Sequence, residues 1–227
     1  MTLAGNRTYR GPDDIPVVVP VFPLPAALLL PRGQLPLNIF EPRYLAMVDA
    51  ALRGDRIIGM VQPRFDHGSV DLTGRPALCD VGCLGRITQF AETGDGRILL
   101  TLSGIVRFSV SEELATTTPY RQVRIATEPF AEDFEANRGE AEVDRKALMS
   151  VFRAYLEANN LEADWASFDQ APTEALVNTL SMMAPYGPAE KQALLQATDL
   201  KTRAEMLIAL TERTLTGEPG RPRSPLQ

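Results

Sequence analysis

The sequence predicts an α+β protein, in which a small β-barrel with one inserted helix is followed by an α-helical subdomain. Two observations support this fold class. Short apolar segments separated by Pro- and Gly-rich turns fill the first 130 residues, which is typical of a small barrel or sandwich, and we favour the barrel. After residue 130 the apolar residues recur at helical spacing, so the period changes from about 2 to about 3.6 residues.

The inserted helix is predicted within the strand-rich part. Residues 15–40 are rich in Val, Leu and Ile but contain six prolines. Because proline cannot donate to a central strand ladder, this segment favours short edge or bulged strands. Pro42 then suits the first turn of a helix, and apolar residues follow at helical spacing until Gly54.

Alternating apolar residues predict the other strands of the barrel. A turn-rich loop is expected at 63–77, and Gly94 and Gly96 suit the positive φ angles of a hairpin turn. The predicted strands are 56–61, a strand starting at Val81, 98–102, 106–110 and 120–125.

Four helices are predicted in the second half, and Asp199 is the expected N-cap of the last one. The segment after residue 216 contains too much Pro and Gly to pack against the rest of the protein. The predicted organisation is therefore a disordered or extended N-terminus at 1–14, the barrel at 15–130, the helical subdomain at 138–216 and a disordered tail at 217–227.

Composition and charge limit the location and the partners. The chain has 227 residues, of which 44% are hydrophobic, and no apolar run approaches the length of a membrane span. It also lacks the pattern of a secretion signal, so we expect a cytoplasmic protein without a membrane partner. Residues 131–227 hold ten basic and sixteen acidic side chains, which account for the whole net charge of −6. An acidic chain without basic tracts makes nucleic acid an unfavoured partner.

No cofactor or metal is expected. Cys79 and Cys83 could supply two thiolates, but tetrahedral zinc needs four ligands, and His67 is the single histidine. On an extended strand the two cysteines would lie about 13 Å apart, too far for a disulfide or a shared ion. Inert thiols are the favoured interpretation.

Three segments carry a family resemblance. They are P-L-N-I-F-E-P-R-Y at 36–44, the ordered G-R-I, D-G-R, L-T-L-S-G and R-F groups between 85 and 108, and E-K-Q-A-L-L-Q-A at 190–197. Over about residues 15–215 the chain resembles the N-terminal substrate-binding domain of Lon proteases, in its stand-alone bacterial form. The resemblance implies a PUA-like β pseudo-barrel, then a helical subdomain, and a role in binding polypeptide.

The chain departs from the full-length protease in the parts that do chemistry. It has no G-x-x-x-x-G-K-[ST] phosphate loop, and 227 residues leave no room for the Ser–Lys protease domain. We therefore expect no enzymatic activity. The expected function is recognition of unfolded or extended polypeptide, as an adaptor or holdase that works with a protease or chaperone.

Two alternatives remain at this stage. A small hydrolase would use His67 as a general base, oriented by Asp66 or Asp71, although no nucleophile elbow accompanies it. An RNA-binding protein is the other alternative, because PUA-like barrels elsewhere bind RNA, and the acidic charge argues against it.

Polar side chains near the proline-rich segment 21–37 are the candidate polypeptide site. Arginine forks and an amide could bind the carbonyl groups or a carboxylate of an extended peptide. The same charges could instead be ion pairs that fix the inserted helix to the barrel, which we favour for Glu41 and at least one arginine. The candidate residues are Asn38, Glu41, Arg43, Tyr44, Arg86 and Arg107.

Overall fold

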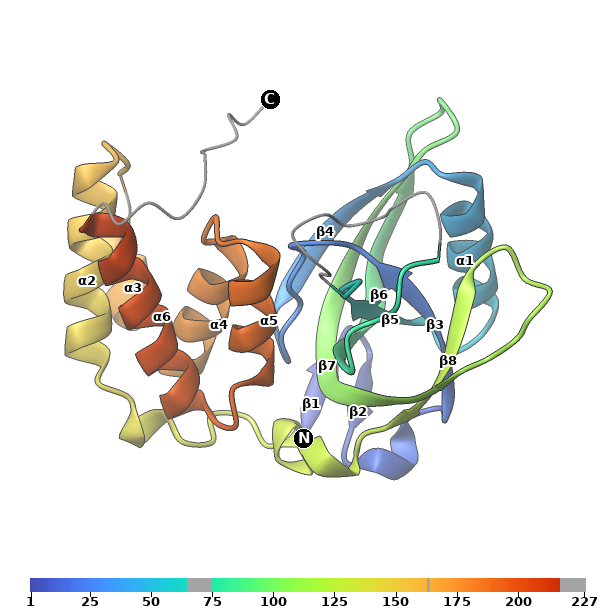
Figure 1. The fold of residues 1–227 in the computed structure, drawn as a ribbon, viewed down its shortest axis with the longest axis horizontal. Helices are drawn as coiled ribbons and strands as arrows, with labels where there is room; N and C mark the ends of the chain where they lie inside the picture. The colour runs from blue at the N-terminus through green and yellow to red at the C-terminus, as the bar shows by residue number, and fades with distance from the viewer. Residues whose placement is uncertain (65–74, 163, 217–227) are drawn as a thin grey trace.

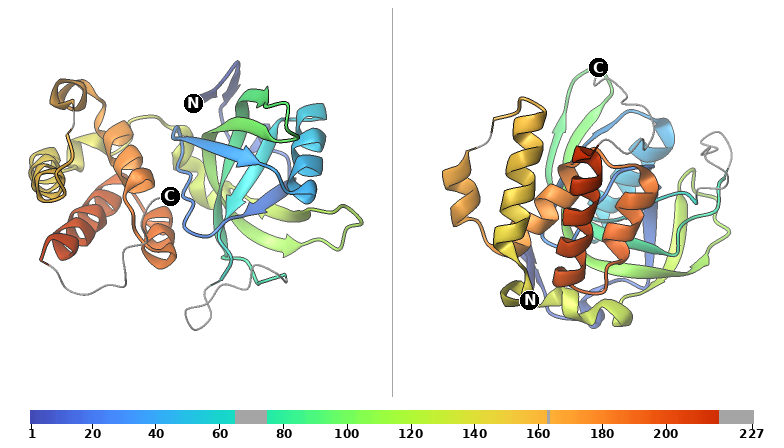
Figure 2. Two further views of the ribbon diagram at one scale, coloured as in Figure 1. Left: turned by 90° about the horizontal axis from the view of Figure 1, so that it is seen from above. Right: turned by 60° about the vertical axis from the view of Figure 1, so that its left-hand side comes forward.

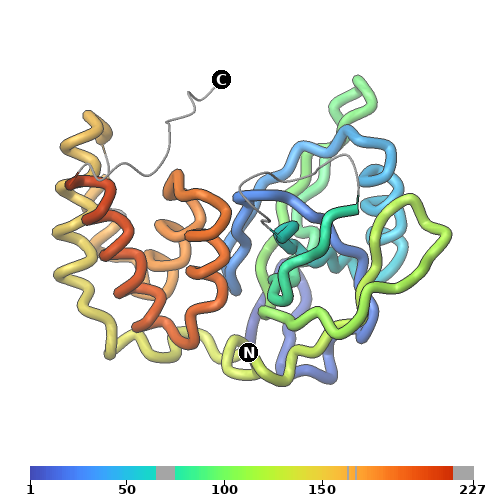
Figure 3. The backbone as a smooth tube through the Cα atoms, viewed as in Figure 1, coloured from blue at the N-terminus to red at the C-terminus, as the bar shows by residue number. Residues whose placement is uncertain are grey.

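The computed structural model describes residues 1–64, 75–162 and 164–216. A β-barrel forms one side of the molecule and a group of helices the other (Figure 1). The chain passes once from the barrel to the helices, through a 3-10 segment, η2, at Glu128–Phe134 (Figure 3). The predicted α+β class, a barrel followed by a helical part, is therefore confirmed.

The barrel is a six-stranded mixed sheet in the order β4-β7-β6-β5-β3-β8. Strands β3 and β5 are parallel, and the other neighbours are antiparallel. A further pairing between β7 and β8 closes the sheet and leaves β4 as an additional edge strand. The strands are β3 Val18–Pro23, β4 Gln34–Ile39, β5 Ile57–Val61, β6 Val81–Glu92, β7 Ile98–Glu113 and β8 Arg121–Ala126.

Strand β7 corrects the prediction of two separate strands at 98–102 and 106–110, because it is continuous over 16 residues. The apolar residues at even positions stay in phase from Ile98 to Val110, and Gly104 occupies the one even position in that range without an apolar side chain. A Cβ at Gly104 would lie 2.0 Å from the carbonyl oxygen of Leu30. The glycine therefore allows a neighbouring loop to cross the strand, and its N–H donates to the Gly33 carbonyl at 2.8 Å.

Helix α1, Pro42–Arg53, is the predicted inserted helix. Proline occupies its first turn, and it ends before Gly54, as the sequence indicates. It contacts β3 and lies on the side of the barrel remote from the other helices (Figure 2). Its buried face consists of Tyr44, Met47, Val48 and Ala51.

The N-terminal residues form a small hairpin of β1, Thr2–Ala4, and β2, Arg7–Tyr9. Ala4 and Tyr9 are fully buried. Within the range predicted as disordered or extended, these residues are thus extended and paired. The predicted disordered tail at 217–227 lies outside the described residues.

The helical part follows a short 3-10 turn, η3 at Glu140–Glu142. The four predicted helices are present, and a short additional helix, α3, was not predicted. Asp199 caps α6 as expected, because its carboxylate accepts from the Thr202 N–H at 2.7 Å. Within the described ranges, no helix is both long and apolar enough to cross a membrane. The helices are α2 Arg145–Ala158, α3 Trp165–Gln170, α4 Thr173–Met183, α5 Pro188–Gln196 and α6 Leu200–Leu215.

A buried polar junction joins the barrel to the helices. Arg107 of β7 is 5% exposed and donates two hydrogen bonds of 2.8 Å to the carboxylate of Asp133 in η2. Its Nη1 group donates to the carbonyls of Leu195 and Ala197 at the end of α5. One cluster of buried apolar side chains also continues from the barrel into the helices. The two parts are thus held by both packing and directional contacts.

A second set of contacts at the junction involves Arg32, whose backbone has a positive φ of 63°. Its guanidinium pairs with Glu174 at the start of α4 and donates to the Asp133 carbonyl at 2.6 Å. The buried Gln62 amide donates to the Pro188 carbonyl and to the side chain of Gln192, both at 3.1 Å. Each of these residues links a barrel loop or strand to a helix.

Replacing Arg107 should destabilise the protein strongly. Arg107→Met leaves Asp133 buried without its cation, and breaking such a pair typically costs about 3–5 kcal/mol of unfolding free energy. The control Arg124→Gln removes an exposed pair with Glu112 and should cost less than about 1 kcal/mol. Denaturant unfolding measures both. The double variant Arg107→Met, Asp133→Asn should recover part of the loss, and losses that simply add would contradict this account.

Stability should also depend on pH through Lys191. This side chain is buried and donates to the carbonyls of Ser181 and Met182 in the last turn of α4. Burial lowers the pKa of its ammonium group to about 8. The unfolded chain keeps this proton up to about pH 10.5, so unfolding takes up a proton above pH 8, and the contribution of Lys191 to stability rises with pH.

The measurement compares the free energy of unfolding of the wild type with that of Lys191→Met from pH 7 to pH 10. Above pH 8, the free energy of unfolding of the wild type should increase relative to that of Lys191→Met. Lys201→Met, which removes an exposed ammonium 3.9 Å from Glu205, should show no such shift. A difference that is flat or that falls with pH would show that Lys191 remains charged in the folded protein.

Candidate functional site

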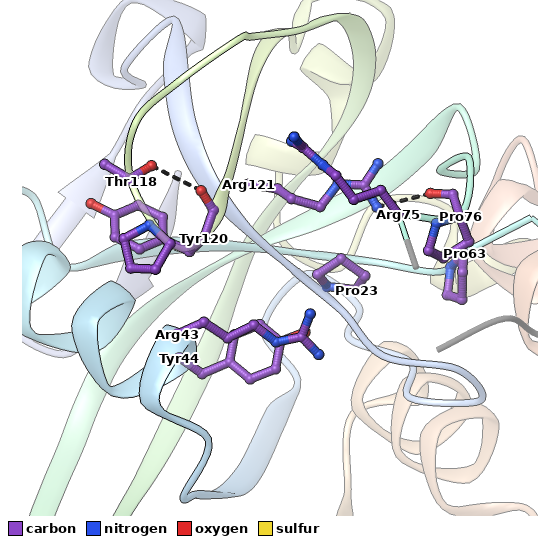
Figure 4. Close-up of a pocket in the computed structure, with 10 residues that line it drawn as sticks. Pro23, Arg43, Tyr44, Pro63, Arg75, Pro76, Thr118, Tyr120 and Arg121 are labelled. Atoms are coloured by element: carbon purple, nitrogen blue, oxygen red, sulfur yellow. Dashed lines mark hydrogen bonds between the residues drawn. The ribbon is translucent and has the colours of Figure 1, made fainter. Parts of the chain in front are cut away.

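An open pocket lies beside α1, on the barrel (Figure 4). We call it the arginine–proline pocket, because four prolines and three arginines supply most of its lining. Arg43 and Tyr44 lie on one side of Pro23, and Arg75 and Arg121 lie across from them. The lining residues are Pro23, Arg43, Tyr44, Pro63, Arg75, Pro76, Thr118, Pro119, Tyr120 and Arg121.

Four segments of the chain meet at the pocket. Strand β3 ends at Pro23, the first turn of α1 supplies Arg43 and Tyr44, and the turn before β8 supplies residues 118–121. Residues 63 and 75–76 come from the two ends of the segment between β5 and β6. The Arg121 guanidinium fixes one of these ends, because it donates to the Pro76 carbonyl at 2.8 Å.

Tyr44 is the buried aromatic residue of the pocket. Tyr44 is 6% exposed, and its ring centroid lies 4.1 Å from that of Phe22. The guanidinium of Arg43 lies over the Tyr44 ring at 4.5 Å, in cation–π contact. Burial raises the pKa of the Tyr44 hydroxyl above its ordinary value, so this ring is neutral at physiological pH.

Three guanidinium groups at the pocket share two carboxylates. Arg43 pairs with Glu41 at 2.9 Å. Glu113 accepts from Arg121 at 2.5 Å and from Arg75 at 2.9 Å. The hydrogen bond from Arg121 is the main cause that lowers the pKa of Glu113. With both carboxylates ionised, the set retains one net positive charge.

This arrangement suits binding rather than bond cleavage. Among the ten lining residues there is no carboxylate, imidazole, thiol or lysine to serve as a general base. Proline and tyrosine rings offer apolar surfaces, and arginines offer paired donors that match a carboxylate or a peptide carbonyl. An extended peptide presents these groups together.

The structure brings together only part of the predicted candidate set. Arg43 and Tyr44 line the pocket, and Glu41 is the exposed ion-pair partner of Arg43. The pair of Glu41 with Arg43 lies within the start of α1 and does not connect the helix to the barrel.

The other three candidates lie elsewhere. Asn38 is exposed on β4, opposite Leu99 of β7. Arg86 donates to the Asp55 carbonyl at 2.6 Å, and Arg107 belongs to the buried junction. Arg107 is thus in an ion pair, but this pair joins the barrel to η2 and not to the inserted helix, and none of the three residues lines the pocket.

Sequence reasoning missed Arg75, Tyr120 and Arg121, together with the individual prolines. The turn signal at Pro119 precedes Tyr120 and Arg121, but nothing in the spacing relates these two residues to Arg43, which is more than 70 residues away from them in the chain. Their proximity arises because β3 pairs with β8 and α1 contacts β3.

The cysteines do not form a ligand set in the described part of the chain. Cys83 is buried in β6, Cys79 is partly buried, and both are free thiols. Burial raises the pKa of each thiol, so both are protonated at neutral pH. No group of three or more potential ligands could hold a metal ion among the described residues. The hydrolase alternative rests on Asp66, His67 and Asp71, which lie outside those residues.

Solved structures with this architecture define the class of fold. A Lon N-terminal domain protein from Xanthomonas campestris superposes with a TM-score of 0.59 at 22% identity, covering 85% of this chain and 97% of its own. The N-terminal domain of a Lon protease from the Mycobacterium avium complex gives a TM-score of 0.63 at 19% identity, covering 86% and 98%. The fold is thus that of Lon N-terminal domains.

Residues 18–213 match the model of the substrate-binding domain of the ATP-dependent protease La, or Lon, and the chain belongs to that family. Lon protease 2 of Myxococcus xanthus is 28% identical over 204 residues, which are 88% of this chain and 24% of the relative. Lon protease of Escherichia coli K12 is 24% identical over 201 residues, 86% of this chain and 25% of the relative. The chain spans about a quarter of the length of the curated relatives it matches.

Proposed function

We propose that this chain recognises unfolded or extended polypeptide and that the arginine–proline pocket is the binding site. The observation that carries the proposal is the pocket itself, with its proline and tyrosine surfaces beside three arginines, on the fold of a substrate-binding family. Apolar side chains of the peptide would contact the prolines and tyrosines, while its polar groups would accept from the guanidinium groups.

Weak and reversible binding is expected. A single peptide segment must be ordered when it binds, and this loss of conformational freedom offsets much of the contact energy. The expected binding free energy is about −8 kcal/mol or less favourable, which corresponds to micromolar dissociation constants. Such affinity suits a protein that captures and releases many segments.

The proposed role is non-catalytic. The chain would act as an adaptor or holdase in protein quality control and would pass polypeptide to a protease or chaperone. We also propose a cytoplasmic location, with which the two free thiols are compatible.

Arg43→Ala tests the site. The Arg43 side chain is 41% exposed, and its salt bridge to Glu41 is a surface pair, so its loss should change the unfolding free energy by less than about 1 kcal/mol. Binding of labelled peptides from an unfolded protein should nevertheless weaken about fivefold or more, measured by fluorescence anisotropy. Arg53→Ala removes an exposed pair with Asp49 on the same helix and is the matched control, which should bind as the wild type does.

Several outcomes would refute the proposal. One such outcome is that the wild type binds none of the peptides. Another is that Arg43→Ala loses binding only in proportion to a lowered melting temperature. An RNA oligonucleotide that binds, weakens steeply with salt and displaces the peptides would instead favour the nucleic-acid alternative.

The purified protein should neither hydrolyse ATP nor degrade an unfolded substrate such as casein. The physical reason is the missing G-x-x-x-x-G-K-[ST] loop, whose backbone N–H groups and lysine hold the nucleotide phosphates. Phosphate release and peptide release over hours measure the two activities. Turnover that copurifies with the protein through further columns, and that His67→Ala removes, would establish the hydrolase alternative.

A further inference from the structure

A second hollow lies between α1, β3 and β8, and it adjoins the arginine–proline pocket. Tyr120 lines both hollows. We call the second one the apolar hollow, because its lining is mainly aliphatic and proline side chains. Its lining residues are Pro16, Val18, Val19, Pro20, Ala50, Ala51, Gly54, Asp55, Ile57, Tyr120 and Gln122.

The same two elements run along both hollows. Helix α1 contributes Tyr44 to the arginine–proline pocket and Ala51 to the apolar hollow, a separation of about 10 Å at 1.5 Å per residue. Strand β3 contributes Pro23 to the first and Val18 to the second, about 17 Å apart at 3.3 Å per residue. The combined track has the length of four or five residues of extended peptide.

The charges at the two ends of the track differ. Three guanidinium groups line the arginine–proline end. Asp55 is the only ionisable side chain that lines the apolar hollow apart from Tyr120, and it pairs with Arg7 at 3.4 Å. A peptide in the track would therefore meet a positive end and an apolar end.

We propose that the track selects extended apolar segments that carry an aspartate or glutamate at one end, with that carboxylate held in the arginine–proline pocket. The inference rests on the proposed function and specifies its substrate class. The charge count carries it, since, in the described part of the chain, Glu41 and Glu113 are the two carboxylates that pair with the three guanidinium groups and leave one positive charge in excess. A carboxylate from the peptide would neutralise this remaining positive charge.

Arg75 is the arginine best placed to bind the peptide carboxylate. Its side chain is 65% exposed, and it shares Glu113 with the better buried Arg121, which makes two contacts to that carboxylate. Arg75 can therefore turn to a peptide carboxylate while Glu113 stays paired. Charge would then fix the orientation of the peptide, while the apolar hollow supplies contact area.

The test uses three blocked peptides with one sequence of leucine, proline and phenylalanine, labelled with rhodamine. One has aspartate at the N-terminal end of the apolar stretch, one has it at the C-terminal end, and one has asparagine at both places. One aspartate peptide should bind the wild type about five- to tenfold more tightly than the asparagine peptide. Arg75→Gln should reduce this ratio to near one, whereas Arg124→Gln, which alters an exposed arginine outside the track, should preserve it.

Ala50→Gln tests the other end of the track, because a longer side chain there would fill the apolar hollow. It should weaken all three peptides by a similar factor and leave the aspartate preference intact, while Asp49→Gln on the exposed side of α1 should have no effect on the apolar contacts.

The outcomes separate this inference from the proposed function. Equal binding of all three peptides, with a loss in Arg43→Ala, would overturn the acidic specificity and leave polypeptide recognition in place. The absence of binding by every peptide would refute the proposed function as well. An equal loss of preference in Arg75→Gln and Arg124→Gln would also overturn the inference, because it would show general electrostatic attraction.

Discussion

The buried ion pair between Arg107 and Asp133 fixes how the two parts of this molecule meet. A guanidinium group with several donors can be removed from water only where each donor finds an acceptor, and here the acceptors come from η2 and from the end of α5. These acceptors constrain the position of the helical part relative to the barrel. The contacts of Arg32 with Glu174 and of Gln62 with Gln192 also join the barrel to the helical part. Apolar packing alone would tolerate small rotations of the helices, whereas this polar junction does not.

The junction and the candidate site use different arginines of the barrel. Helix α1 is remote from the helical part (Figure 1), whereas the arginine–proline pocket extends from α1 to Pro63, which follows the junction residue Gln62. The barrel therefore uses two kinds of arginine for two purposes. Arg107 is desolvated and makes four side-chain hydrogen bonds, so it contributes to architecture, while Arg43 and Arg75 keep much of their exposure and can exchange partners. Since surface pairs contribute little stability, their exchange on binding costs little.

Local signals predicted much of the fold. Proline and glycine marked the ends of α1, Asp199 marked the start of α6, and the change in period separated strands from helices. The prediction failed where distant contacts decide the structure. Two separate strands were predicted at 98–102 and 106–110, although the strand is continuous and Gly104 within it permits another loop to cross. Likewise, nothing local distinguishes Arg107 from Arg43, because the distinction lies in Asp133, 26 residues further along the chain. Most of the pocket was missed for the same reason.

The length of β7 has a consequence for the order of folding. This strand pairs with β4, which precedes it by some 60 residues, and with β6 and β8. Loop closure over such separations is slow relative to helix formation, so the barrel should limit the rate at which the whole chain folds. The helices can form early but cannot dock, since Arg107 reaches its position only when β7 is in the closed sheet. During synthesis, the helical part would therefore dock only after the barrel has formed.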